Sequence, residues 1–194
     1  MHGFLKHGYT LVEVLVVVII IGVMSTMGVA GLQRAVANAR IKDAAINSAA
    51  FVERVANESS RLSAVLCLKI DPTSPQTMIV VKEEDDGDGP KDCSDPKGGI
   101  VDELHIDAPA RFVEMQKCGP VDLDWFSNTT YITFKPRLGL SAAPLKGGIC
   151  IQYGDQDVYG AVRKKQGINR AIPMWKVGSD GTTNASWNVG WNEL

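Results

Sequence analysis

A single carboxylate, Glu13, directly precedes a long apolar run. This combination of a charge and an apolar segment constrains the chain more than any other feature. From Val14 to Leu32 there are 19 residues without a charge. A helix of this length measures about 28 Å, close to the thickness of the hydrocarbon core of a bilayer. A carboxylate at the edge of such a span is costly unless it has a partner. The sequence therefore predicts a membrane helix in which Glu13 has a specific purpose.

The segment before this run and the overall composition set the orientation and the class of protein. Met1 to Gly8 carries Lys6 and the N-terminal amine. A basic end stays cytoplasmic, so the rest of the chain should cross the membrane. The net charge of -2 and the apolar share of 45% are typical of one globular domain with an anchor. They argue against a disordered chain and against a protein that coats nucleic acids.

The six residues from Gly8 to Glu13 (Gly-Tyr-Thr-Leu-Val-Glu) resemble the processing site of type IV prepilins and type II secretion pseudopilins. The resemblance implies that a prepilin peptidase/N-methyltransferase cuts between Gly8 and Tyr9 and then methylates the amine of Tyr9. It also implies that Glu13 pairs with the N-terminal amine of an adjacent subunit during assembly. Attraction between opposite charges in a medium of low dielectric constant would support such a pairing.

An ordinary secretory signal peptide is the alternative interpretation of the N-terminus. Gly28-Val29-Ala30 has the small residues that signal peptidase prefers, and cleavage after Ala30 would release a secreted β-domain. The long apolar run and the carboxylate at its start favour the prepilin interpretation. An ordinary leader needs neither feature.

The apolar run continues into an amphipathic helix that should end near Leu62. Apolar and small residues recur at intervals of three and four on one face, at positions 41, 45, 48, 52, 55, 59, 62 and 66, a spacing typical of a helix lying on a globular domain. The charged residues Arg40, Lys42, Asp43, Glu53, Arg54 and Glu58 lie off this face. We expect four segments: a leader (1–8), a transmembrane or filament-core helix (9–33), its amphipathic continuation (34–62) and a β-rich extracytoplasmic domain (63–194).

Beyond the helix the apolar residues alternate with a period of two, which indicates strands. The expected strands are 65–70, 77–82, 111–115, 130–135, 149–153, 158–164 and 171–177, separated by Gly, Pro and Asp. The segment 83–99 is acidic and rich in glycine, and we expect a surface loop there. Short strands without further helices predict an α+β fold, with a mainly antiparallel sheet or sandwich after the long helix.

Two segments of the C-terminal half narrow the resemblance. Thr130 to Gly139 and Gly147 to Ile151 resemble the paired strands of the GspH/FimT class of minor pseudopilins and minor pilins. This resemblance implies a subunit at or near the tip of a filament, in either a type II secretion system or a type IV pilus. Its partners would be other pilins or pseudopilins, the inner-membrane assembly platform and membrane lipid. Its location would be the bacterial inner membrane, with a single pass, before assembly into the filament.

The four cysteines all fall in the segment that we place outside the cytoplasm, where disulfides persist. They are Cys67, Cys93, Cys118 and Cys150. Four cysteines allow three pairings, and their spacing does not choose among them. None of the pairs has the C-x-x-C spacing, which argues against zinc or redox chemistry.

An acidic cluster and a basic cluster each have a plain interpretation and a functional one. Residues 83–89 contain five carboxylates and two glycines, and the plain interpretation is a solvated loop without a cofactor. The alternative is a calcium site formed by Asp85, Asp86 and Asp88, although the EF-hand spacing is absent.

The basic cluster consists of Arg163, Lys164 and Lys165, with Arg170 nearby. A solvated hairpin is favoured over contact with DNA, because the net charge of the protein is negative. A DNA-binding minor pilin is therefore the second alternative function. No Ser/His/Asp set is evident, since His105 is the one histidine that remains after removal of the leader. We therefore expect a structural protein and no enzyme.

Overall fold

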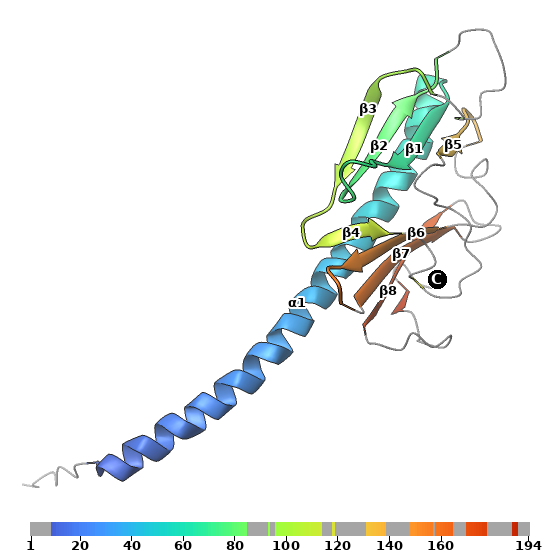
Figure 1. The fold of residues 1–194 in the computed structure, drawn as a ribbon. Coiled ribbons are helices and arrows are strands. Elements are labelled where there is room, and N and C mark those ends of the chain that lie inside the picture. The colour runs from blue at the N-terminus through green and yellow to red at the C-terminus, as the bar shows by residue number, and fades with distance from the viewer. Residues whose placement is uncertain are drawn as a thin grey trace, which may run out of the picture. The chain divides into compact units, whose positions relative to one another are not determined.

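The computed structural model describes residues 9–84, 93, 96–113, 118, 131–138, 148–156, 158–164, 170–177 and 188–189. The chain divides into two compact units, Met1–Ala37 and Asn38–Leu194. One helix, α1 (Leu11–Leu62), begins in the first unit, and all the described strands belong to the second. The predicted α+β fold, with a long N-terminal helix followed by antiparallel sheets, is confirmed (Figure 1).

Helix α1 ends at Leu62, as predicted, and hydrogen bonds close its last turn. The N–H of Ala64 donates to the carbonyl of Ser59 at 3.2 Å, and the N–H of Ser63 donates to the carbonyl of Ser60 at 3.4 Å. This pair of bonds is the Schellman motif, which normally places glycine at the left-handed position. Here Ser63 occupies that position with φ of 49°. The backbone therefore leaves the helix in a defined direction and enters the first strand three residues later.

The predicted stripe on the second half of α1 is buried at six of its seven helical positions. Ile41, Ala45, Ser48, Val52, Val55 and Ser59 are buried. The exception is Leu62, which is 42% exposed at the end of the helix. Of the charged residues expected off the stripe, Arg40, Lys42, Asp43 and Arg54 are exposed, and Glu53 and Glu58 are half-buried. The amphipathic pattern of the sequence therefore corresponds to one face laid on the β-domain.

The described strands form two antiparallel sheets, with orders β3-β2-β1-β5 and β4-β6-β7-β8-β9. Their bounds are β1 Leu66–Ile70, β2 Thr77–Lys82, β3 Ile100–His105, β4 Ala110–Val113, β5 Ile132–Phe134, β6 Gly148–Tyr153, β7 Val158–Lys164, β8 Ala171–Val177 and β9 Asn188–Val189. Sheet A (β1, β2, β3 and β5) lies beside the C-terminal part of α1, and sheet B (β4 and β6–β9) lies beside the preceding turns (Figure 1).

Seven of the nine strands in the described residues correspond to predicted segments, and three of them (β2, β7 and β8) have the predicted bounds. Strand β3 and the two-residue β9 were not predicted from the sequence. Strand β3 has the sequence Ile-Val-Asp-Glu-Leu-His, which lacks a clean alternation. It is one of the two edge strands of sheet A, and its register against β2 shifts between Val80 and Val81. An exposed edge strand with a bulge needs no continuous apolar face.

Both sheets turn an apolar face toward α1. Leu66 and Val80 of sheet A line the same cavity of about 240 Å³ as Val55 and Leu62 of the helix. In sheet B, a Cβ on Gly160 would lie 3.2 Å from the backbone oxygen of Ile41. The absence of a side chain at position 160 therefore permits the close approach of β7 to the helix. Full burial of a large apolar side chain stabilises the fold by about 1.5–3 kcal/mol.

Candidate functional site

The N-terminal segment places its predicted site residues around the first turn of α1. Gly8 lies outside the described residues, and Tyr9 is 82% exposed. Thr10 precedes the helix, and its Oγ1 accepts a hydrogen bond of 3.2 Å from the N–H of Glu13. The backbone carbonyl of Thr10 also accepts from the N–H groups of Glu13 and Val14, at 3.1 and 3.3 Å. Thr10 is therefore the N-cap of the helix.

This geometry gives Glu13 a second, local role at the start of the helix, which was not predicted from the sequence. Thr10 and Glu13 have the spacing of a capping box, in which a Thr cap is followed three residues later by Glu or Gln. A carboxylate in the first turn also interacts favourably with the helix dipole, by about 0.3–1 kcal/mol. The Thr-x-x-Glu spacing in the sequence could have predicted this capping role. The side chain of Glu13 is exposed.

The first half of α1 exposes apolar side chains all round the helix. Every described side chain from Leu11 to Ser25 is exposed, as are Val29 and Leu32. A helix that is apolar on every face requires an apolar environment or other helices around it. Over the ranges that the structure describes, none of the helices reaches the length and hydropathy that a membrane span requires.

The structure joins the four cysteines into two disulfides, Cys67–Cys93 and Cys118–Cys150. This is one of the three possible pairings. The first disulfide connects β1 to the segment between β2 and β3, and the second connects Cys118 to β6. All four cysteines are buried. Cross-links across loops of this length stabilise a domain by about 2–4 kcal/mol, chiefly by constraining the unfolded chain.

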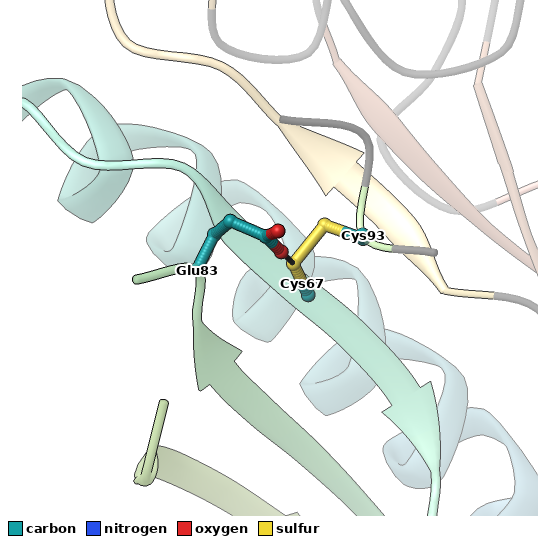
Figure 2. Close-up of side chains that lie close together, drawn as sticks. All are labelled: Cys67, Glu83 and Cys93. Carbon is teal, nitrogen blue, oxygen red and sulfur yellow. Dashed lines mark hydrogen bonds between the residues drawn. A yellow bond between two sulfur atoms is a disulfide. The ribbon is translucent and has the colours of Figure 1, made fainter. Parts of the chain in front are cut away.

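A carboxylate lies against the first disulfide. An oxygen of Glu83, the residue that follows β2, is 3.3 Å from Sγ of Cys67 (Figure 2). Together with Sγ of Cys93, these three ligand atoms lie within 4.8 Å of one another. Such a cluster has the composition of a metal site. Because each sulfur is bonded to the other, neither is a thiolate, and the oxidised cluster offers one carboxylate as a metal ligand.

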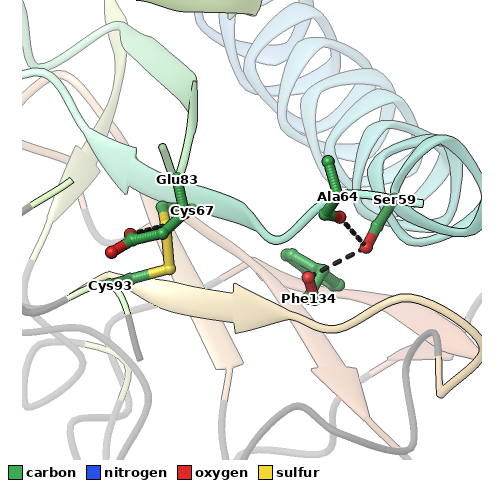
Figure 3. The surroundings of a disulfide bond; sticks show 6 residues. All are labelled: Ser59, Ala64, Cys67, Glu83, Cys93 and Phe134. Carbon is green, nitrogen blue, oxygen red and sulfur yellow. Dashed lines mark hydrogen bonds between the residues drawn. A yellow bond between two sulfur atoms is a disulfide. The ribbon is translucent and has the colours of Figure 1, made fainter. Parts of the chain in front are cut away.

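The other side of the same region joins the end of α1 to sheet A (Figure 3). Ser59 is fully buried, and its Oγ lies 2.8 Å from the carbonyl of Ala64 and 2.9 Å from the carbonyl of Phe134. The hydroxyl has a single proton, which it shares between these two carbonyl acceptors. A buried carbonyl left without a donor costs about 1–3 kcal/mol, so Ser59 stabilises the junction of helix and β5.

The charged clusters of the sequence lie largely outside the described residues. Asp85, Asp86 and Asp88 fall there, as do Lys165 and the side chains of Arg163 and Lys164. Arg170 is described and is exposed. Lys176, which lies near this cluster in the sequence, is 6% exposed, and its Nζ donates to the carbonyl of Cys118 at 3.2 Å. It also lies 5.0 Å from the ring centroid of Tyr159. Lys176 is thus part of the interior.

The one histidine of the described region, His105, contacts a threonine hydroxyl on the neighbouring strand. Nδ1 of His105 lies 3.1 Å from Oγ1 of Thr77, across the pairing of β2 and β3. Thr77 Oγ1 also lies 2.9 Å from Oγ of Ser74. His105 itself is exposed on the edge strand, and these contacts stabilise the turn between β1 and β2.

Comparison with known proteins identifies the N-terminal segment. Residues 4–29 match the family model described as the prokaryotic N-terminal methylation motif. This motif supports a type IV pilin-like or pseudopilin protein that is a substrate of prepilin peptidase and has pilin-type partners. It indicates a structural protein rather than an enzyme, and it suggests membrane anchoring. No curated protein and no solved structure matches the chain.

Proposed function

We propose that this protein is a minor pilin or pseudopilin of the GspH/FimT class, which serves a type II secretion system or a type IV pilus. The observation that carries the proposal is the match of residues 4–29 to the methylation motif, directly at the start of a 52-residue helix. A capped helix that begins two residues after the expected cleavage point is what a processed subunit needs. The β-domain that follows agrees with a subunit whose outer part is globular.

In this proposal the chain has the four segments expected from the sequence. Residues 1–8 are the leader, 9–33 the helix that anchors the protein in the inner membrane, 34–62 its continuation and 63–194 the extracytoplasmic domain. The uncharged run from Val14 to Leu32 and the exposed apolar side chains of this part of α1 support the anchor. After processing, the same surface would lie in the core of a filament, with the subunit at or near its tip.

The test of processing is the N-terminus of the mature protein. Mass spectrometry of protein from its native host should show N-methylated Tyr9 as the first residue. Gly8→Val should leave a longer precursor in the membrane, because the peptidase admits the bare backbone of glycine at this point. A mature chain that begins at Gly31 would instead establish cleavage by signal peptidase and a secreted β-domain.

Glu13 could support assembly by pairing its charge with a neighbouring subunit or by capping its own helix. One set of variants distinguishes these two explanations. Glu13→Gln keeps the length of the side chain and a residue that fits the capping box, but removes the charge. Glu13→Leu removes both. If Glu13 pairs with the amine of a neighbouring subunit, both variants should be inserted and cleaved normally but should fail to co-purify with other subunits. Glu13→Asp should give a partial defect.

The capping explanation makes a different prediction for the same variants. If Glu13 serves the helix alone, Glu13→Gln should assemble like the parent protein and Glu13→Leu should be impaired. Secretion or piliation, measured in the same strains, should follow co-purification in either case. Normal assembly of Glu13→Gln would therefore refute the charge-pairing role and leave the processing assignment unaffected.

A further inference from the structure

The contact between Glu83 and the Cys67–Cys93 disulfide places a carboxylate directly on a sulfur atom. The oxygen lies 3.3 Å from Sγ of Cys67 (Figure 2). Since this sulfur is bonded to Cys93, it has no proton to donate. The contact is therefore not a hydrogen bond in the oxidised protein. It holds a negative charge beside the atom that must accept electrons if the disulfide is reduced.

The backbone at Glu83 and at the residue before it is hydrogen-bonded to two neighbouring segments, so this contact is built into the fold. The N–H of Glu83 donates to the carbonyl of Val65 at 3.0 Å, which continues the pairing of β1 with β2 by one step. The preceding residue, Lys82, donates its N–H to the carbonyl of Gly99 at 3.3 Å. A Cβ on Gly98 would overlap the backbone of Lys82, so the segment before β3 packs tightly against this point.

Glu83 also connects the disulfide to a solvent-accessible space. Cys67 and Cys93 are 0% and 3% exposed, whereas Glu83 is half-buried. Glu83 lines a hollow of about 710 Å³ together with residues of the helix end and of β3, and neither cysteine lines it. A small reductant that enters this hollow would meet the carboxylate next to the disulfide.

We propose that Glu83 slows the reduction of the Cys67–Cys93 disulfide by thiols. In reduction, a thiolate attacks one sulfur, forms a mixed disulfide with it and expels the other sulfur as a thiolate. A second thiolate of the reductant then resolves the mixed disulfide, so that the protein gains two electrons and the reductant is oxidised to its own disulfide. Attack on Cys93 makes Cys67 the leaving thiolate, beside the Glu83 carboxylate. Attack on Cys67 brings the reductant's thiolate toward the same carboxylate. In both routes a thiolate lies next to the Glu83 carboxylate. The repulsion between these two negative charges slows the reaction.

The second disulfide provides an internal control with a different electrostatic environment. Sγ of Cys118 lies 3.6 Å from the carbonyl oxygen of Gly160, a neutral group. The ammonium of Lys176 binds the backbone carbonyl of the same cysteine, and a nearby cation favours a thiolate. Both disulfides are buried, so a change of global stability would affect the two together. Removal of the Glu83 charge should affect Cys67–Cys93 alone.

The experiment measures the reduction rate of each disulfide in the native full-length protein. The parent, Glu83→Gln and Glu84→Gln are incubated with dithiothreitol, samples are alkylated, and peptide mass spectrometry quantifies the free cysteines of each pair. Glu84 is the neighbouring, exposed carboxylate and is the matched control. Glu83→Gln should accelerate reduction of Cys67–Cys93 by at least about fivefold. The rate at Cys118–Cys150 should not change, and Glu84→Gln should behave as the parent at both pairs.

A second measurement needs no variant, and it keeps the proposal testable if Glu83→Gln folds poorly. The parent is reduced with cysteamine, a cationic thiol, and with 2-mercaptoethanesulfonate, an anionic one. The ratio of the cationic to the anionic rate should be larger at Cys67–Cys93 than at Cys118–Cys150. Equal ratios at the two disulfides would overturn the proposal. So would an unchanged rate at Cys67–Cys93 in Glu83→Gln, or an equal acceleration of both pairs.

Discussion

The carboxylate of Glu53, on α1, accepts a hydrogen bond of 3.1 Å from the backbone N–H of Ala171, the first residue of β8. The next residue of the helix, Arg54, forms an ion pair of 2.8 Å with Asp102 of β3. Two consecutive side chains of α1 therefore contact the two different sheets. This arrangement places the junction of sheets A and B on one turn of the helix.

The bond from Ala171 to Glu53 should contribute more to stability than the neighbouring ion pair. Ala171 is 4% exposed, so Glu53→Ala leaves its N–H unsatisfied in the interior and should cost about 1–3 kcal/mol of unfolding free energy. Glu53→Gln keeps an acceptor oxygen and should cost less. Arg54→Ala removes an exposed ion pair, worth about 0–1 kcal/mol. Urea denaturation of the full-length variants measures all three, and equal stabilities of Glu53→Ala and Arg54→Ala would contradict the ranking.

Two adjacent glycines, Gly98 and Gly99, should differ sharply in their tolerance of alanine. A Cβ on Gly98 would lie 2.9 Å from the carbonyl carbon of Lys82 and closer still to its oxygen, whereas a Cβ on Gly99 would meet nothing within 4 Å. Gly98→Ala must displace backbone and should destabilise the protein by about 1–3 kcal/mol. Gly99→Ala should be nearly neutral. Thermal unfolding of the two variants gives the comparison, and similar midpoints for both would show that the segment before β3 is not held as described.

The disulfide pairing should be recovered from the native protein. Peptide mapping without reduction should yield cross-linked peptides that contain Cys67 with Cys93 and Cys118 with Cys150. Replacement of both members of either pair by alanine should lower the unfolding free energy by about 2–4 kcal/mol. Cross-linked peptides with another pairing, or four alkylated thiols in protein exported by its host, would contradict this result.

Acid should weaken the turn between β1 and β2 through Asp71. Its Oδ1 accepts hydrogen bonds from the hydroxyl and from the N–H of Thr73, at 2.7 and 2.8 Å. These bonds hold the pKa of Asp71 below its ordinary value of 3.8. A carboxyl with a lowered pKa stabilises the folded state fully above its unfolded pKa, and this stabilisation is lost as the pH falls through the folded pKa.

The variants Asp71→Asn and Thr73→Val test this pH dependence. Asp71→Asn keeps an oxygen acceptor but does not titrate, so it should lose less stability than the parent as the pH falls from about 5 to about 2. Thr73→Val removes the hydroxyl donor alone and should show an intermediate dependence. The measurement is the thermal midpoint as a function of pH. Parallel curves for the parent and Asp71→Asn would show that Asp71 contributes nothing to the acid sensitivity.

Strand β3 and Glu83 have roles in the fold that their local sequence does not encode. Strand β3 was missed because its exposed, partly charged residues carry no apolar alternation. Its pairing partner, β2, lies about 19 to 28 residues earlier in the chain. Glu83 was predicted to belong to an acidic surface loop, because acidic residues follow it directly in the sequence. What distinguishes it is the contact of its side chain with Cys67, which arises because β2 continues its pairing with β1 as far as Val65.

The sequence by itself determined those features that depend on residues close together in the chain. The spacing of three and four along residues 41–59 predicted the buried face of α1, and alternation predicted β2, β7 and β8 with their bounds, because each pattern reflects the geometry of one element. The methylation motif is likewise a local string of residues. The tertiary structure alone decided the order of the strands in two sheets, the choice among three cysteine pairings, and the contacts of Glu53 and Glu83. These depend on which distant surfaces pack together, and no local period encodes that choice.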